Sequence, residues 1–251
     1  MRNLEMVIQY DGGRYEGWQR LGGGKAGRTI QGVLEEALSG ITGAPVEVIG
    51  SGRTDAGVHA LGQVANFHTR SGLSCGEIVS ALERTLPPDL AVRTVKEADP
   101  RFHARFHARA KRYAYRLDTG AVHDVFMRRY ALHIPRPLDW DEMRRAADCL
   151  CGRHDFTSCT NARLKEKSAE RVIHSIEFVR DGQFVDLEFF GDGFLHNMVR
   201  ILAGTLVEVS SGRLAASDIP GILEARSRQA AGPMLPAHAL VLVEVLYGQE
   251  S

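Results

Sequence analysis

The segment SGRTDAGVHA, residues 51–60, brings together side chains that could do chemistry. It places the carboxylate of Asp55 two residues from the guanidinium of Arg53 and between small residues that include Gly57. An ionised carboxylate can act as a nucleophile or a general base, but Asp is also common in turns, where it bonds to nearby backbone. The motif alone leaves both roles open.

Two further polar side chains stand in surroundings that suggest a function. In FLHNMVR, residues 194–200, Arg200 lies among apolar helical residues, so its charge must pair with a carboxylate or reach solvent along its stem. Tyr113 lies in the alternating segment RAKRYAYRL, where a tyrosine more often belongs to a core than to a site. Each residue is ambiguous alone, and Asp55, Tyr113 and Arg200 become persuasive only as a set.

Positive charge gathers in residues 101–129. This segment holds eight Lys and Arg residues against Asp118 and Asp124, a local excess of six, whereas the whole chain has 31 basic and 31 acidic residues. Aromatic residues are interleaved with the charges: Phe102, Phe106, Tyr113, Tyr115 and Phe126. The pattern is typical of a phosphate-binding stripe with stacking platforms, but a solvated strand face would look the same.

Three other patterns resemble ligand sites but lack either the required spacing or a required residue. The stretch GGGKAGRT, residues 22–29, lacks the register of a phosphate-binding loop, and His103 and His107 lack the Glu of a metalloprotease helix. Cys149 and Cys151 are two residues apart, which suits neither a zinc site nor a redox pair. We therefore expect reduced structural thiols, no metal and no cofactor.

Hydrophobic periodicity predicts the elements that must position these residues. Strands are expected near residues 3–10, 45–51, 62–69, 89–96, 109–117, 172–180, 183–190 and 239–247. Helices are expected near residues 29–42, 75–86, 139–151, 195–209 and 216–227, with Thr29 as the N-cap of the first. The alternation of strands and helices predicts an α+β protein. It has an N-terminal half, 1–107, with the Asp55 loop and a C-terminal half, 108–251, with Tyr113 and Arg200.

Bulk composition excludes several classes of protein. Apolar residues make up 44% of the chain and charged residues 25%, as in ordinary globular proteins. The longest apolar runs, such as residues 239–243, are too short to cross a bilayer, and the first residues alternate like a strand rather than a secretory signal. We expect a cytoplasmic protein with no membrane segment.

Taken together, the motifs resemble the TruA family of tRNA pseudouridine synthases over nearly the whole chain. The segment GRTDAGVHALGQV, residues 52–64, is the most specific match. The segments YDGGRYEGWQ, TIQGVLEEAL, FHARFHARAKRYAYRL, HDFTS, FLHNMVRILAGTLVEV and ALVLVEVLY also fit. The GGGKAG insertion and residues 160–170 depart from the family pattern.

The resemblance implies the pseudouridine synthase fold, with two α/β halves around a mixed, largely antiparallel sheet and a central active-site cleft. It also implies an isomerase in which Asp55 is the nucleophile, attacking either C6 of uracil or C1′ of ribose. Arg200 would oppose the rise in pKa that burial imposes on Asp55, and Tyr113 would hold the base and assist proton transfer at C5. Arg53 would enter the gap left by the extruded uridine.

The resemblance further implies a homodimer that acts on the anticodon stem-loop of tRNA at uridines 38, 39 and 40. The residues expected to contact RNA, besides Arg53, are Gly52, Thr54, Gly57, His59, Arg109, Lys111 and Arg112. Two alternatives stay open. One is a pseudouridine synthase with another RNA target, and the other is a non-catalytic RNA-binding module, which would have no use for a buried charged nucleophile.

Overall fold

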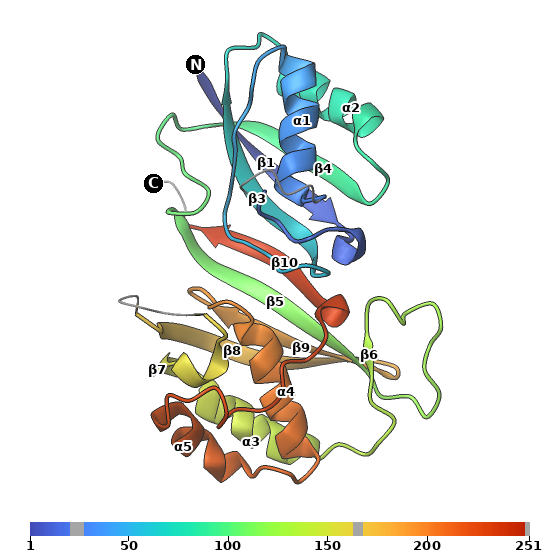
Figure 1. Cartoon of the computed structure of the whole chain (residues 1–251), viewed down its shortest axis with the longest axis vertical. Helices are drawn as coiled ribbons and strands as arrows, with labels where there is room; N and C mark the ends of the chain where they lie inside the picture. The colour runs from blue at the N-terminus through green and yellow to red at the C-terminus, as the bar shows by residue number, and fades with distance from the viewer. Residues whose placement is uncertain (21–27, 163–167, 249–251) are drawn as a thin grey trace. The chain divides into compact units, whose positions relative to one another are not determined.

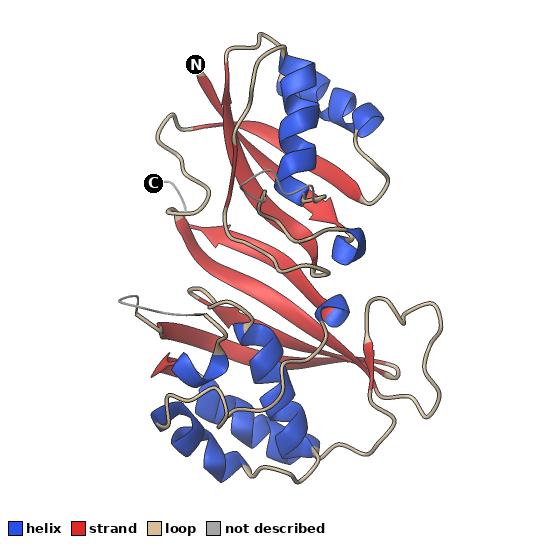
Figure 2. Cartoon of the chain, viewed as in Figure 1, coloured by secondary structure: helices blue, strands red, loops and turns tan. Residues whose placement is uncertain are grey.

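The computed structural model describes residues 1–20, 28–162 and 168–248. Contacts divide the chain into two compact units. Unit 1 comprises Met1–Arg109 and Val241–Ser251, and unit 2 comprises Ala110–Leu240. Each unit combines strands and helices, and the sheet is mixed and largely antiparallel, which confirms the predicted α+β class (Figures 1 and 2).

Unit 1 is built on strands in the order β4-β1-β3-β10, with β2 paired to β3. Their bounds are β1 (Arg2–Tyr10), β2 (Val48–Gly50), β3 (His59–Thr69), β4 (Leu90–Ala98) and β10 (Leu240–Tyr247). All these pairs are antiparallel except β10 with β3, which is parallel. Alternate residues of β1, including Leu4, Met6 and Ile8, are fully buried, as the period-2 pattern predicts.

The helices of unit 1 begin and end where capping chemistry dictates. Helix α1 (Ile30–Thr42) starts after Thr29, whose side chain accepts a hydrogen bond from the Gly32 N–H, and this confirms the predicted N-cap. It ends at Gly43, which has a φ of 73°. Helix α2 (Cys75–Thr85) starts with a capping box formed by Ser74 and Glu77. Helix α1 contacts α2 and β2, and α2 contacts β4.

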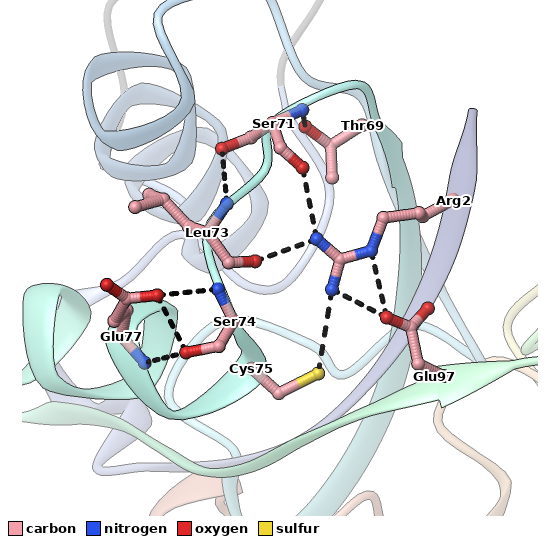
Figure 3. A network of polar contacts seen from close by, with 8 residues as sticks. All are labelled: Arg2, Thr69, Ser71, Leu73, Ser74, Cys75, Glu77 and Glu97. Carbon is pink, nitrogen blue, oxygen red and sulfur yellow. Dashed lines mark hydrogen bonds and ion pairs between the residues drawn. The ribbon is translucent and has the colours of Figure 1, made fainter.

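A polar network around Arg2 ties the start of β1 to its surroundings (Figure 3). The Arg2 guanidinium donates to Glu97 of β4 at 2.8 Å and to the carbonyl oxygens of Ser71 and Leu73 at 3.0 and 2.7 Å. Because Ser71 and Leu73 lie just before α2, one side chain joins two strands and a helix N-terminus. This network stabilises the sheet and contains none of the predicted site residues.

Unit 2 has strands in the order β5-β9-β8-β7, with β6 parallel to the end of β5. Their bounds are β5 (Ala108–Asp118), β6 (Leu132–His133), β7 (Gly152–Asp155), β8 (Glu170–Asp181) and β9 (Phe184–Gly191). The helices are α3 (Trp140–Leu150), α4 (Met198–Ser210) and α5 (Ile219–Glu224). Helix α3 contacts α4, α5 and β8, and α4 is buried along most of its length.

The predicted halves 1–107 and 108–251 remain a prediction, and the compact units have related but different bounds. The first division of the chain falls after Arg109. Strand β10 pairs with β3, at Val241 with His59 and at Leu242 with Ala60, so the end of the chain contributes a strand to unit 1. Periodicity predicts this strand but cannot reveal its partner.

Further features concern ligands and membranes. The four cysteines, Cys75, Cys149, Cys151 and Cys159, are free thiols. Within the described ranges, no three His, Cys, Asp or Glu side chains gather as metal ligands would. No helix in those ranges is long and apolar enough to cross a membrane. The Gly- and Lys-rich insertion, residues 22–27, lies outside the described residues.

Candidate active site

Asp55 occupies the first position of a tight turn between β2 and β3. The carbonyl oxygen of Asp55 accepts a hydrogen bond from the Val58 N–H at 3.1 Å. Gly57, the third turn residue, has a φ of 80°, which is typical of a type II turn and favours glycine. Asp55 therefore forms the turn with its main chain, while its half-buried side chain takes no part in the closing bond. Turn formation and chemistry are compatible roles.

The residue before Asp55 is held on both its main chain and its side chain. The Trp18 N–H donates to the Thr54 carbonyl at 3.0 Å, and the Thr54 hydroxyl lies 2.8 Å from the hydroxyl of buried Tyr10. Gly17 permits this approach because a Cβ there would lie 2.8 Å from the Thr54 oxygen. Thr54 is 6% exposed, so its side chain serves the fold of the loop rather than presenting a polar surface.

Both ends of the loop are also hydrogen-bonded. The hydroxyl of buried Ser51 donates to Gln63 Oε1 at 2.6 Å, and Gln63 Nε2 donates to the Gly52 carbonyl at 3.3 Å. His59 Nδ1 lies 3.0 Å from the Gly12 backbone nitrogen and 3.1 Å from a carboxylate oxygen of Asp11. With His59 only 7% exposed, one of its nitrogens is engaged inside unit 1.

Arg53 differs from its neighbours because its side chain is exposed while Thr54 is buried. The loop thus directs a guanidinium to solvent two residues before a half-buried carboxylate. A rigid loop with one exposed cation and one partly shielded anion can bind a polyanion and also act on it. The sequence motif gives the residue types, and the structure shows that Arg53 is exposed whereas Asp55 is half-buried.

Tyr113 lies in the middle of β5 in unit 2, opposite Phe189 of β9. It is 8% exposed, and its ring meets the ring of Phe194 edge-on with centroids 5.3 Å apart. Phe194 lies in the segment that leads from β9 to α4, the helix of Arg200. The sequence pattern allows Tyr113 to be either a core residue or a site residue. Its burial on β5 is compatible with both roles and does not distinguish between them.

Arg200 is oriented by groups that the sequence does not indicate. Its Nε donates to the Leu235 carbonyl at 2.7 Å, and Nη1 donates to Asn197 Oδ1 at 3.3 Å. Asn197 has a φ of 62°, an uncommon conformation that Asn tolerates better than most residues. Leu235 lies in a loop and not in a helix or strand. Periodicity in the sequence therefore cannot indicate its contact with Arg200, and only the folded structure reveals that contact.

Tyr115 is a buried neighbour of this group. Its hydroxyl donates to the Pro236 carbonyl at 2.9 Å. Burial raises the pKa of Tyr115 far above its ordinary value, and the positive charge of Arg200 acts in the opposite direction. Tyr115 is therefore a neutral donor at physiological pH and helps to hold the 235–236 segment beside Arg200.

Cross-strand carboxylates reduce the charge of the basic segment. Arg112 lies 3.3 Å from Glu188, and Arg116 makes a bidentate contact with Asp186 at 2.7 and 2.5 Å. Arg109 is exposed, and Lys111 is half-buried. Counting charges along 101–129 misses the two carboxylates because they belong to β9.

The predicted site residues thus fall into two groups by unit. Unit 1 holds the loop residues Gly52, Arg53, Thr54, Asp55, Gly57 and His59, together with Arg109. Unit 2 holds Lys111, Arg112, Tyr113 and Arg200. Sequence reasoning missed Asn197, Leu235 and Gly17, although the polar Asn197 three residues before Arg200 was a signal that could have found the first.

Comparison with known proteins agrees over nearly the whole chain. The family model described as tRNA pseudouridine synthase matches residues 6–107 and 146–248, which include Asp55 and Arg200 but not Tyr113. A tRNA pseudouridine synthase A from Acetivibrio thermocellus is 43% identical over 247 residues, covering 98% of this chain and 100% of the relative.

Two further relatives come from bacilli. A tRNA pseudouridine synthase A from Bacillus sp. strain KSM-64 is 47% identical over 232 residues, covering 92% of this chain and 94% of the relative. A tRNA pseudouridine synthase A 2 from Bacillus anthracis is 44% identical over 245 residues, covering 98% and 99%. The chain belongs to the tRNA pseudouridine synthase family.

Proposed function

We propose that this protein is an isomerase that converts uridine to pseudouridine in tRNA, at positions 38, 39 and 40 of the anticodon stem-loop. Membership of the family supports the reaction and the substrate class. The observation that carries the proposal is the GRTDAG loop, which holds Asp55 at the head of a hydrogen-bonded turn. The reaction requires a nucleophile in a fixed place, and a hydrogen-bonded turn at Asp55 supports that role.

In the proposed reaction, the Asp55 carboxylate attacks either C6 of uracil or C1′ of ribose. With attack at C1′, the carboxylate displaces N1 of uracil, the uracil turns while it remains bound, and C5 then attacks C1′ and displaces the carboxylate. With attack at C6, the N1–C1′ bond breaks in the adduct, C5 of the turned base bonds to C1′, and loss of the C5 proton expels the carboxylate from C6. On either route C5 loses a proton, N1 gains one, and the carboxylate is regenerated. The atoms of substrate and product are the same, so the chemistry needs no external electrons.

Tyr113 and Arg200 have distinct proposed roles. Tyr113 offers a flat ring to hold the uracil and a hydroxyl to assist proton transfer at C5. Arg200 supplies a positive charge to the reaction, and the bonds to Leu235 and Asn197 restrict its orientation. A preorganised charge is effective because it need not reorient during the reaction.

The RNA must be opened before a stacked uridine can react. We propose that Arg53, exposed on the Asp55 loop, occupies the place of the extruded base. Gly52, Thr54, Gly57 and His59 would shape the loop against the RNA, and Arg109, Lys111 and Arg112 would contact phosphates. Arg112 is the weakest of these candidates because Glu188 pairs with it.

We further propose that the protein works in the cytoplasm as a homodimer, as the family resemblance implies. Analytical ultracentrifugation with and without tRNA tests the dimer. A monomer at every concentration that supports turnover would contradict this part of the proposal and leave the reaction itself intact.

The reaction is tested by incubating the purified protein with tRNA transcripts that carry tritium at C5 of uridine. Tritium release and the appearance of pseudouridine at positions 38, 39 or 40 are the expected results. Release with pseudouridine only at other positions would support the isomerase and contradict the assigned positions. Binding without any release would contradict the enzyme proposal.

A further inference from the structure

The segment 99–107 of unit 1 presents one aromatic ring to solvent from an otherwise well-held loop. Of the aromatic residues interleaved with charge in this part of the chain, Phe102 is 8% exposed, whereas Phe106 is 74% exposed. Burying an exposed Phe is favourable, so a ring left in solvent gains stability only when a partner covers it. The question is what covers Phe106.

The loop beneath Phe106 is fixed by buried polar side chains. Asn3 Nδ2 donates to the carbonyl oxygens of Asp99 and Phe102 at 2.9 and 2.8 Å. Asn66 Oδ1 accepts from the Ala104 N–H at 2.9 Å, and both asparagines are at most 2% exposed. These contacts come from β1 and β3, so the sheet itself determines the course of the loop.

Tyr247 is a third side chain that fixes the loop, and it bonds to the carbonyl of Ala104. The Tyr247 hydroxyl of β10 donates to the Ala104 carbonyl at 2.7 Å, and its ring lies against the ring of Phe102 with centroids 5.2 Å apart. The N–H and the carbonyl of Ala104 are therefore both bonded, two residues before Phe106. These bonds preorganise the loop, so binding a partner would cost the loop little further backbone entropy.

His103 supports the exposed ring. The two rings are stacked, with centroids 4.1 Å apart and planes 29° from parallel. His103 Nδ1 accepts from the backbone N–H groups of Arg105 and Phe106 at 3.2 and 3.4 Å, which restricts the orientation of the imidazole. The result is a two-ring stack whose outer member, Phe106, is open to solvent.

Positive charge flanks the stack. The Arg101 side chain is 95% exposed, and Arg105 is also exposed. Asp99 offers limited compensation because its carboxylate lies 3.8 Å from Arg101 Nε and already accepts the Arg101 backbone N–H at 2.7 Å. An aromatic face between exposed arginines suits a nucleobase with its phosphates.

A protein partner fits this surface less well. Phe106 is the single large apolar side chain exposed in the segment 99–107, and specific protein interfaces need an extended patch with an apolar centre. A contrasting surface exists in unit 2, where Val122, Val125 and Phe126 are all exposed within one short segment. One ring between charges matches a base, whereas three clustered apolar residues resemble a protein contact.

We propose that the His103–Phe106 stack is a nucleobase platform on which an unpaired base of the tRNA stacks, with Arg101 and Arg105 contacting the adjoining phosphates. This inference rests on the proposed function for its ligand, and it adds a binding element outside the Asp55 loop. Because a ring face accepts any base, the platform contributes affinity and register rather than sequence preference.

The test is binding of an unmodified tRNA transcript to variants at position 106. Phe106→Leu keeps apolar volume but removes the aromatic face, and it should weaken binding by roughly 5- to 140-fold, the usual range for losing one base stack. Phe106→Trp should bind like the wild type, and its added indole fluorescence should be quenched by tRNA. Val179→Ala, at an exposed apolar residue of β8, is the matched control and should leave binding unchanged.

The possible results distinguish a base platform from a protein contact and from failure of the proposed function. Wild-type affinity in Phe106→Leu would overturn the platform, as would an unquenched indole in Phe106→Trp. A change in sedimentation of Phe106→Leu with unchanged tRNA affinity would identify a protein contact instead. Failure of the wild type to bind and convert tRNA would remove the proposed function and the platform together. Conversion by the wild type with unaffected variants would remove the platform alone.

Discussion

The Arg200 guanidinium donates from Nε to the Leu235 carbonyl at 2.7 Å, while the Leu235 N–H donates to the Arg200 carbonyl at 3.3 Å. A helix residue and a residue 35 positions later thus bond to each other through both side chain and backbone. The irregular 232–236 segment, which carries Leu235, therefore holds a side chain of α4 in a defined direction. This explains how a charged residue on a largely buried helix is oriented.

The first prediction concerns Asn197, the second group that orients Arg200. Asn197→Gly removes the side-chain oxygen that accepts from Arg200, and glycine tolerates the φ of 62° at this position. Turnover should fall on the order of tenfold, the usual effect of one hydrogen bond to a charged group, with little change in KM. Steady-state kinetics at several pH values measures this.

Asn197→Ala is the companion variant because it adds backbone strain to the same loss. Alanine at a left-handed φ costs about 1–2 kcal/mol, so the Ala variant should be less stable than the Gly variant in urea unfolding but no less active per folded molecule. Wild-type turnover in Asn197→Gly would show that Asn197 does not position Arg200.

The second prediction concerns the support of the Asp55 loop. Gly17 has a φ of 94°, and a Cβ there would lie 2.8 Å from the Thr54 oxygen and 3.2 Å from backbone atoms of Asp55 and Ala56. Gly17→Ala should reduce turnover strongly because the loop must shift. Gly43→Ala is the control, since Gly43 has a similar φ of 73° but no atom within 4 Å of an added Cβ.

Both glycine variants should lose about 1–2 kcal/mol of unfolding free energy from the positive φ alone. Only Gly17→Ala should lose activity at temperatures where both variants are folded. Equal turnover by the two variants would mean that the geometry of the loop is not critical.

The third prediction concerns the phosphate contacts proposed for Arg109 and Lys111. Reversing the charge with Arg109→Glu and Lys111→Glu should weaken tRNA binding and flatten the dependence of log K on log salt. The slope should change by roughly 0.7–0.9 for each phosphate that the variant no longer neutralises. Arg93→Glu, at an exposed residue of β4, controls for overall charge. A slope that changes equally in the control would indicate a general charge effect rather than defined phosphate binding.

The fourth prediction concerns pH and the end of β5. Burial by itself would raise the pKa of the Asp118 carboxyl, but backbone N–H groups of Asp124 and Gly120 and the amide of Gln183 bond to the carboxylate and hold its pKa below the ordinary value of 3.8. A lowered pKa in the folded state means that this stabilisation is complete above pH 3.8 and is lost as the pH falls through the folded-state pKa.

Asp118→Asn should therefore destabilise the protein by about 1–3 kcal/mol at pH 7, and the difference from the wild type should shrink as the pH falls below about 4. Urea unfolding at a series of pH values tests this. A difference that is constant with pH would assign the effect to packing rather than to the carboxylate charge.

Much of the fold could be predicted because local chemistry determines it. Thr29 and Gly43 bound α1, and the alternation of β1 matches its burial. The last predicted helix, 216–227, is instead a 3₁₀ turn, η3 (Ala216–Asp218), followed by α5, with Pro220 near its start. The predicted start was too early because Pro220 lacks the N–H that would bond to the carbonyl of Ala216, and the helix also ends earlier than predicted, at Glu224.

The candidate site could be predicted only in part. Residue type and spacing single out Asp55, Arg53 and Arg200 as candidates, and their roles stay predictions. Asp186 and Glu188 compensate the basic segment across a strand pair, and that pairing is a tertiary property. Likewise, nothing in the sequence distinguishes Phe102 from Phe106. Contacts with distant strands fix the loop so that Phe102 is buried and Phe106 is exposed.

We propose above that the Asp55 carboxylate is the nucleophile. Asp55→Asn preserves shape and hydrogen-bonding capacity but cannot form the bond, since an amide is a poor nucleophile. The direct measurement is tritium release from tRNA labelled at C5 of uridine, with tRNA binding measured in parallel. We predict wild-type affinity and no release by Asp55→Asn at any pH. Sustained turnover by Asp55→Asn, free of wild-type enzyme, would contradict the nucleophile assignment.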